Sequence, residues 1–156
     1  MKAVIAVGGM GTRLVSVAKD IPKALVPIGG KPIIEHQIIL LVKHGITDFW
    51  ILTGHLGDQI QTYLGDGQKW GANISYSQEE KPLGTAGALA AIQNHLQEDF
   101  LFLSGDIMMD FNVKKFIGWH KEKKNATASL VVHPSDHPFD SDLVQISHDE
   151  DRKSVV

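Results

Sequence analysis

Short apolar runs alternate along this chain with longer segments whose apolar residues recur at helical spacing. The run KAVIAV (residues 2–7) is continuously apolar after its first residue, which is typical of a strand buried on both faces. Residues 32–45 repeat apolar positions every three or four residues between an early proline and a final glycine, which predicts a helix. The same criteria predict strands at 48–54, 73–78, 100–106 and 126–133 and helices at 56–67, 85–97 and 113–125, with Thr85 as an N-cap.

This alternation predicts an α/β fold. We expect a three-layer, Rossmann-like, mostly parallel sheet with helices on both faces, formed by one domain over residues 1–156. Residues 143–147 predict a last strand, for which an antiparallel orientation is one option. Ligands of such sheets bind at the carboxyl ends of the strands, so residues 8–13, Gly54 and residues 104–106 should share one rim.

Composition narrows the function classes. The chain has 156 residues, 43% of them apolar, and a net charge of −3, so no global attraction to nucleic acid or to an anionic membrane is expected. It contains no cysteine, which excludes disulfides and thiolate metal sites and suits a cytoplasmic location. No apolar run is long enough for a membrane span. Any site for an anion must therefore be local.

A glycine-rich loop, GGMGTR (residues 8–13), follows the first predicted strand. It matches neither the dinucleotide fingerprint, which needs a third glycine where Leu14 stands, nor the P-loop, which needs Gly-Lys-Ser/Thr. Its backbone N–H groups can still form a nest for an anion, and Arg13 adds a forked cation suited to phosphate. The alternative is a plain turn with a surface arginine.

A second segment, KDIPKALVPIGGKPIIEH (residues 19–36), places Lys23 directly after a proline. Together with GGMGTRL it closely resembles the G-G-x-G-T-R-L…P-K-x-L-x-P…K-P signature of the sugar-nucleotide pyrophosphorylases, which are nucleotidyltransferases. The resemblance continues through EEKPLGTAGAL (79–89) and LSGDIMMD (103–110), and so covers nearly the whole chain. The spacer VSVAKDIPKALVPI and the loop HPSDHPFDSDLV look most like the D-glycero-D-manno-heptose 1-phosphate guanylyltransferase branch, with mannose-1-phosphate guanylyltransferases next.

The resemblance implies a reaction and a set of roles. A sugar 1-phosphate attacks the α-phosphorus of a nucleoside triphosphate, pyrophosphate leaves, and an NDP-sugar forms. Arg13 and Lys23 are the implied catalytic residues, and Asp106, at the end of an apolar strand, is the implied ligand of Mg²⁺. An ordinary turn or cap carboxylate is the alternative for Asp106. The implied nucleotide-binding residues are Gly8, Gly9, Gly11, Thr12, Glu79, Glu80, Gly84 and Thr85.

The identity of the base is suggested by the residues before PLGTAG. Guanine presents two adjacent donors, which a carboxylate accepts together, and the chain offers Glu79 and Glu80. Uracil or thymine would suit an amide, and Gln78 is adjacent. GTP is therefore favoured as the substrate, and a uridylyl or thymidylyl transferase is the alternative. The other interpretation of Glu79 and Glu80 is that they are solvated side chains with no role in binding a base.

The resemblance also raises expectations about the protein beyond these motifs. The family has Leu-Ala before its glycine pair where this chain has Ala6-Val7, a small change. Its members continue well past this length, so we expect a chain truncated before the sugar pocket and a second metal carboxylate. A homo-oligomer and a fusion to a phosphatase domain are further expectations. A non-catalytic nucleotide or sugar-phosphate sensor on the same fold remains the rival function.

Overall fold

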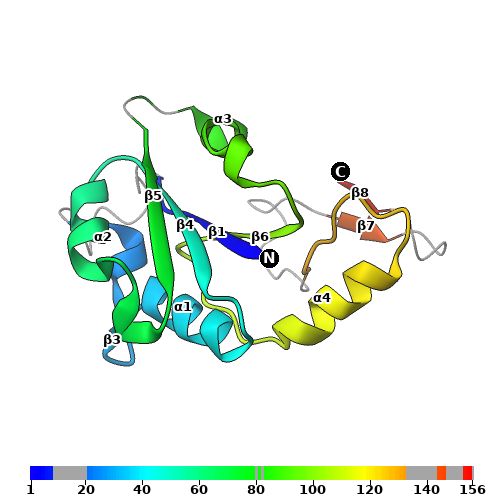
Figure 1. Cartoon of the computed structure of the whole chain (residues 1–156), viewed down its shortest axis with the longest axis horizontal. Coiled ribbons are helices and arrows are strands. Elements are labelled where there is room, and N and C mark those ends of the chain that lie inside the picture. Colours follow the sequence, from blue (N-terminus) through cyan, green and yellow to red (C-terminus); the bar gives the residue numbers. More distant parts are fainter. Residues whose placement is uncertain (9–20, 80, 82, 133–143, 147–152, 156) are drawn as a thin grey trace. The chain divides into compact units, whose positions relative to one another are not determined.

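The computed structural model describes residues 1–8, 21–79, 81, 83–132, 144–146 and 153–155 (Figure 1). The chain forms two compact units, Met1–Lys114 and Lys115–Val156. All of the predicted site residues belong to the first unit. No helix among the described residues has the length and apolarity that crossing a bilayer requires.

The first unit is built on a four-stranded parallel sheet, which confirms the α/β prediction. The spatial order is β5-β4-β1-β6, and each neighbouring pair is parallel. The chain runs outward from the central β1 through β4 to β5, and then returns to place β6 on the other side of β1. The strands are β1 (Lys2–Ala6), β4 (Asp48–Thr53), β5 (Asn73–Gln78) and β6 (Phe100–Ser104).

Helices cover both faces of this sheet, as the sequence predicts. On one face, Val4 of β1 and Leu52 of β4 are buried against Ala88 and Ile92 from the α3 region. On the other side, Figure 1 places α1 and α2, whose buried stripes include Ile38 and Ile60. Because side chains alternate along a strand, a continuously apolar strand supplies both interfaces. The helices are α1 (Ile33–Lys43), α2 (Gly57–Leu64) and α3 (Gly84–Ala91), the last followed by the 3-10 turn η4 (Gln93–His95).

A small hairpin that the sequence analysis did not predict precedes α1. Strands β2 (Pro27–Ile28) and β3 (Lys31–Pro32) pair antiparallel around Gly29 and Gly30. Both glycines have positive φ, +58° and +85°, which is the conformation that a two-residue hairpin turn needs and that glycine adopts most easily. The hairpin leads directly into α1, with Pro32 at the position before its first residue.

The second unit contains α4 (Val113–Glu122), which begins at the end of the first, and a β-pair. The predicted last strand is confirmed as β7 (Val144–Ile146), which pairs antiparallel with β8 (Lys153–Val155). The strand predicted at 126–133 is wrong, since its described part, residues 126–132, contains no strand. Leu130 and Val131 are each 58% exposed there. Apolar residues with strand propensity form a strand only where a neighbouring strand pairs with them.

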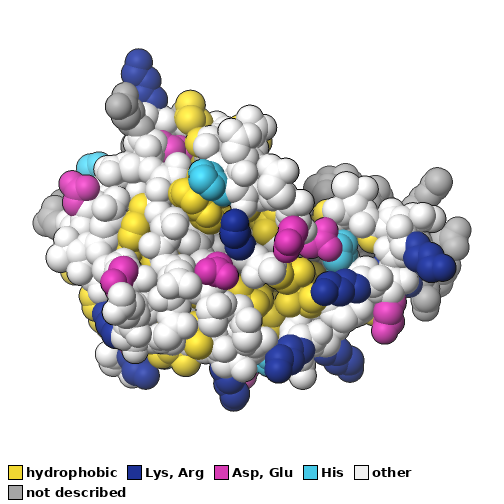
Figure 2. All heavy atoms as spheres, viewed as in Figure 1, with side chains coloured by type: hydrophobic (Ala, Val, Ile, Leu, Met, Phe, Trp, Pro, Cys, Tyr) yellow, Lys and Arg dark blue, Asp and Glu magenta, His cyan; other side chains and the backbone are white. Residues whose placement is uncertain are grey.

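Surface charge is mixed. On the face drawn in Figure 2, Lys and Arg side chains are interspersed with Asp and Glu side chains and do not gather in one basic field. This agrees with the net charge of −3 and with the expectation that an anion would be bound by a local arrangement of groups.

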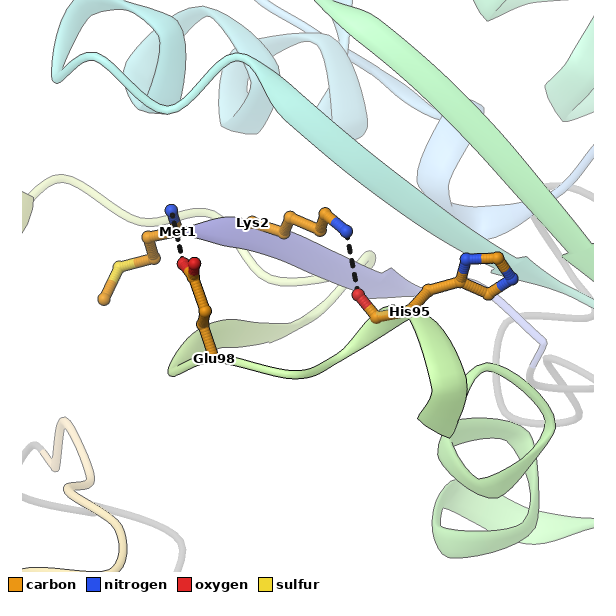
Figure 3. A network of polar contacts seen from close by, with 4 residues as sticks. All are labelled: Met1, Lys2, His95 and Glu98. Atoms are coloured by element: carbon orange, nitrogen blue, oxygen red, sulfur yellow. Dashed lines mark hydrogen bonds and ion pairs between the residues drawn. The ribbon is translucent and has the colours of Figure 1, made fainter.

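The start of β1 is tied to the segment that precedes β6 (Figure 3). The Lys2 Nζ donates to the His95 carbonyl oxygen at 2.8 Å, and the Met1 ammonium lies 3.6 Å from the Glu98 carboxylate. The His95 ring also lies against Trp50, with ring centroids 4.7 Å apart. These contacts hold the amino-terminal edge of the sheet and leave the opposite edge for the candidate site.

Candidate functional site

The carboxyl end of β1 is the point where the strand order of the sheet reverses. The Val7 N–H donates to the Leu52 carbonyl of β4 at 2.9 Å, and the Gly105 N–H donates to the Ala6 carbonyl at 2.8 Å. The end of β4 and the segment after β6 are therefore both hydrogen-bonded to the end of β1. In open α/β sheets, ligands bind in the crevice at such a switch point.

Glycines allow these segments to come together. A Cβ added to Gly54 would lie 3.3 Å from both the Cα and the carbonyl oxygen of Gly8. A Cβ added to Gly105 would lie 2.3 Å from the Val7 Cγ1 and 3.2 Å from the Ala6 oxygen. Contacts under 3.0 Å essentially never occur for a real Cβ, so any other residue at position 105 requires Val7 or the adjoining backbone to shift. The backbones at Gly8, Gly54 and Gly105 are therefore packed closely around the end of β1.

Lys23 and Asp106 meet at this edge. Lys23 begins the 3-10 turn η2 (Lys23–Leu25), which is closed by a Leu25 N–H bond to the Pro22 carbonyl at 2.8 Å. Its Nζ lies 3.9 Å from the Asp106 Oδ2, at the outer limit of an ion pair. The side chains are 28% and 43% exposed, so the pair is open to solvent. A weak, half-exposed ion pair leaves both groups available to a charged ligand.

The Asp106 carboxylate fits a hard cation in part. Its Oδ1 accepts a hydrogen bond of 2.6 Å from the Ser104 hydroxyl, which orients the group, and its Oδ2 faces Lys23. Within the described residues, no group of three or more His, Asp or Glu side chains is arranged to hold a metal. Mg²⁺ is commonly held by one or two carboxylates together with substrate phosphates and water, so a single aspartate fits that kind of site and no all-protein cage.

The predicted base-recognition segment lies beyond β5. The Glu79 N–H donates to the Thr53 carbonyl at 2.9 Å, and the Glu79 Oε2 accepts the Leu83 N–H at 3.3 Å. The carboxylate therefore spans the loop to the start of α3. Gly84, the first residue of α3, has a φ of +70°, and Thr85 is exposed. The prediction of Thr85 as N-cap is wrong: the helix begins one residue earlier, and the position before it is Leu83, without a side-chain cap.

Several predicted site residues lie outside the described residues, so the structure does not place them. Of the others, it brings Lys23 and Asp106 together and puts Gly8, Glu79 and Asp106 directly or shortly after strands β1, β5 and β6. No described contact joins Glu79 or Gly84 to the Lys23–Asp106 pair. The residues outside the description are Gly9, Gly11, Thr12, Arg13 and Glu80.

Gln37 was not predicted as a site residue. It lies on α1, is 1% exposed, and donates through Nε2 to the carbonyls of Ser104 and Ile107, at 2.8 and 2.7 Å. These carbonyls bracket Asp106. The sequence carried a signal for it, because Gln37 falls on the apolar stripe of a predicted amphipathic helix, where a polar residue needs a buried partner.

The resolved pKa shifts belong to two tyrosines away from this edge. A hydrogen bond to Glu35, followed by burial and the Glu35 charge, raises the pKa of Tyr63 to about 12. Burial, followed by the charge of Asp66, raises the pKa of Tyr76 to about 12. Both hydroxyls are hydrogen-bonded, that of Tyr76 to the Gly65 carbonyl at 2.6 Å. They are structural groups of α2 and β5.

Comparison with known proteins gives one family match. The model of the family described as "Nucleotidyl transferase" matches residues 2–152. A mannose-1-phosphate guanyltransferase of Candida albicans is 34% identical, over 100% of this chain and 43% of the relative. A UTP–glucose-1-phosphate uridylyltransferase of Synechocystis is 35% identical, over 85% of this chain and 37% of the relative.

Solved structures give the same picture of the fold. HddC from Yersinia pseudotuberculosis is 32% identical, with a TM-score of 0.66 over 76% of this chain and 53% of that one. The same protein has been solved in complex with GMP-PN. The chain spans about two fifths of the length of the curated relatives it matches, 43% and 37% for the two named above.

Proposed function

Because the chain belongs to the nucleotidyl transferase family, we propose that it transfers a nucleotidyl group from a nucleoside triphosphate to a sugar 1-phosphate. The observation that carries the proposal is the Lys23–Asp106 pair at the switch point of the sheet, where a cation and a carboxylate are open to solvent near the closely packed glycine segments. These are the groups that binding of a polyphosphate requires.

In this reaction a phosphate oxygen of the sugar 1-phosphate attacks the α-phosphorus. The bond from that phosphorus to the bridging oxygen breaks, and pyrophosphate leaves with the electron pair. The nucleophile is already an anion at neutral pH, so no general base is needed. The obstacle is charge: two unit charges 4 Å apart repel by about 4 kcal/mol at an effective dielectric of 20. Cations and N–H groups placed in advance lower that barrier.

We assign the groups accordingly. Lys23 binds the α-phosphate and the incoming sugar phosphate, and Arg13 neutralises the departing pyrophosphate. Asp106 would hold Mg²⁺, which when bound supplies further neutralisation of phosphate charge. The Ser104 hydroxyl, at 2.6 Å, keeps the Asp106 carboxylate turned towards this edge. The backbone N–H groups proposed to wrap the triphosphate are those of Gly8, Gly9, Gly11 and Thr12.

Strand spacing supports a nucleotide lying along this edge. Glu79 follows β5 and Asp106 follows β6, with β4 and β1 between them. Three strand spacings of about 4.8 Å separate those ends by about 14 Å, so a ligand that reaches both must lie extended along this edge. The base would then lie by Glu79, Gly84 and Thr85, with its phosphates by Gly8, Lys23 and Asp106.

We propose GTP as the donor and a heptose 1-phosphate as the acceptor. A carboxylate from Glu79 or Glu80 can accept both Watson–Crick donors of guanine, and Glu79 already accepts an N–H at 3.3 Å. Guanyltransferase relatives and the HddC complex with GMP-PN support a guanine nucleotide. The uridylyltransferase relative keeps UTP as the alternative donor, and mannose 1-phosphate is the alternative acceptor. The proposal places the reaction in the cytoplasm.

The test is pyrophosphate release with Mg²⁺ present. The chain, and the longest natural polypeptide that carries it, should each be assayed with GTP, UTP, dTTP, ATP and CTP against heptose 1-phosphate, mannose 1-phosphate and glucose 1-phosphate. We expect release with GTP and a heptose 1-phosphate at the highest kcat/KM. Turnover with UTP and with no other nucleotide would indicate that the donor is UTP and that Gln78, not Glu79 or Glu80, recognises the base. Tight nucleotide binding without turnover, with every acceptor, would favour a sensor instead.

A further inference from the structure

Gln37 is a buried amide whose orientation is fixed by its partners. It is 1% exposed on α1, and the two atoms that approach one end of its side chain are both carbonyl oxygens. A carbonyl cannot donate, so the approached atom must be Nε2, with each of its two hydrogens given to one carbonyl. The amide nitrogen therefore donates two hydrogen bonds to the end of β6 and the segment that follows it.

The two acceptors lie on either side of Asp106. Nε2 is 2.8 Å from the Ser104 oxygen and 2.7 Å from the Ile107 oxygen. Within the bracketed segment, the Gly105 N–H is bonded to Ala6 and the Ser104 hydroxyl to the Asp106 carboxylate. We propose that Gln37 is a positioning residue for nucleotidyl transfer, because its amide holds the Ser104–Ile107 segment and so directs the Asp106 carboxylate towards Lys23. This inference rests on the function proposed above.

The same helix also anchors the other half of the pair. The N–H of Ile33, the first residue of α1, donates to the Val26 carbonyl at 3.2 Å, and the Val26 N–H donates to the Lys23 carbonyl at 3.0 Å. Helix α1 is thus hydrogen-bonded to the η2 turn through its first residue and to the Asp106 segment through Gln37. The distance between Lys23 and Asp106 is set by one rigid element.

The energetic pattern suits positioning more than stability. The Gln37 Oε1 is buried and has no hydrogen-bond partner among the described residues. An unpaired buried acceptor costs about 1–3 kcal/mol, which offsets most of the gain from the two N–H bonds. An apolar side chain of similar length would avoid that cost. Gln37 therefore contributes little net stability, and what the amide supplies is the geometry of one segment.

The first experiment measures that geometry without any substrate. Amide hydrogen exchange of Gly105 should be compared with that of Val7, whose N–H bonds to Leu52, in the chain and in Gln37→Met and Gln37→Glu. Both variants keep the length of the side chain and remove the Nε2 donor. We expect Gly105 exchange to accelerate about tenfold or more relative to Val7, because local opening of that segment becomes easier.

A matched control separates positioning from general loosening. Ile38→Val lies next to Gln37 on α1, is fully buried, and removes one methylene at a cost of about 0.5–1.5 kcal/mol. It should lower the urea midpoint and leave the Gly105-to-Val7 exchange ratio unchanged. An unchanged ratio in both Gln37 variants, or an equal rise in Ile38→Val, would overturn the proposal.

The second experiment is kinetic. If the longest natural polypeptide releases pyrophosphate, Gln37→Met should lower kcat about 10- to 100-fold, as displaced supports of metal ligands do, with the KM for the nucleotide nearly unchanged. Ile38→Val should retain kcat. A raised KM with kcat intact would overturn the positioning role. Absence of turnover in both the unmodified chain and the longest natural polypeptide would contradict the proposed function. The Gly105-to-Val7 exchange ratio would still show whether Gln37 holds the Ser104–Ile107 segment.

Discussion

The Lys23 ammonium lies 3.9 Å from the Asp106 carboxylate, although one residue follows the first strand of the sheet and the other follows the last. Helix α1 is hydrogen-bonded to the segments that carry both residues, and the η2 turn and the Ser104 hydroxyl hold the two groups locally. Both side chains stay partly exposed. The pair is thus placed by the surrounding backbone more than by its own attraction, and its removal should affect chemistry more than stability.

Asp106→Asn should separate those two effects. The amide oxygen can still accept from the Ser104 hydroxyl, so the segment keeps its conformation. We expect the urea-derived free energy of unfolding to change by less than about 1 kcal/mol, as for other exposed ion pairs. Pyrophosphate release should fall about 100-fold or more, because the carboxylate proposed to hold Mg²⁺ is lost. Asp110→Asn, an exposed carboxylate on the same segment, is the control and should retain the rate.

Gly105→Ala should destabilise the chain without changing its charge. Its Cβ would lie 2.3 Å from the Val7 Cγ1, so the end of β1 or the segment after β6 must move, at a cost of about 1–3 kcal/mol. Gly118→Ala is the opposite case, because Gly118 lies inside α4 with no atom within 4 Å of the added Cβ. It should stabilise its helix by about 0.5–1 kcal/mol. Urea unfolding followed by circular dichroism measures both, and equal effects would contradict the packing described here.

The two tyrosines of the chain should ionise together at high pH. Their folded-state pKa is raised from 10.0 to about 12, by the Glu35 hydrogen bond for Tyr63 and by burial for Tyr76. The folded chain holds these protons more tightly than the unfolded chain. Its stability from this source is therefore complete below pH 10 and is lost as pH rises from 10 to 12.

Ultraviolet absorbance of tyrosinate provides the measurement. The native chain should show little tyrosinate at pH 11, and the chain in concentrated urea should titrate near the ordinary value of 10.0. Tyr63→Phe should remove about half of the native signal and identify its midpoint. A native titration that coincides with the titration in urea would show that neither hydroxyl is held as described.

Glu79→Gln should weaken discrimination between bases. The substitution replaces an acceptor for two guanine donors with a group that offers one acceptor and one donor, which suits uracil better. We expect kcat/KM for GTP to fall about tenfold relative to UTP, the scale of one lost charge-assisted hydrogen bond. Glu98→Gln, 81% exposed beside the amino terminus, should leave the ratio unchanged. A GTP-to-UTP ratio that does not move would remove Glu79 from base recognition.

The sheet could be predicted because β1, β4 and β6 are largely apolar, β5 alternates, and helical patterns lie between the strands. Their carboxyl ends had to share one edge, which predicted that Gly8, Gly54 and residues 104–106 come together; in the structure Gly54 approaches Gly8, and Gly105 is hydrogen-bonded to Ala6. The β2–β3 hairpin was missed, although the pair Gly29-Gly30 is a known turn signal. The segment at 126–132 shows the reverse error: its alternation favours a strand, but a strand also needs a partner, and local pattern does not report one.

Two features of the site could not be predicted from the sequence and became evident only in the structure. Thr85 is of a residue type favoured at N-caps and precedes a predicted helix, yet Gly84 adopts a φ of +70° as the first residue of the helix, so the cap position is Leu83. The role of Gln37 depends on carbonyls that are far away in sequence, and hydrophobic periodicity only indicates that its position is buried. Sequence spacing predicts which edge carries the chemistry, and long-range hydrogen bonds decide how each group on that edge is held.

The closeness of Gly8, Gly54 and Gly105 at the end of β1 has a practical consequence for engineering. Directed evolution towards a different nucleotide or sugar should leave the codons of Gly54 and Gly105 unchanged, because a Cβ would lie 3.3 Å from the Gly8 backbone at Gly54 and 2.3 Å from the Val7 side chain at Gly105. A productive library would keep these two glycines constant and vary Gln78, the last residue of β5, and Glu79, which follows it.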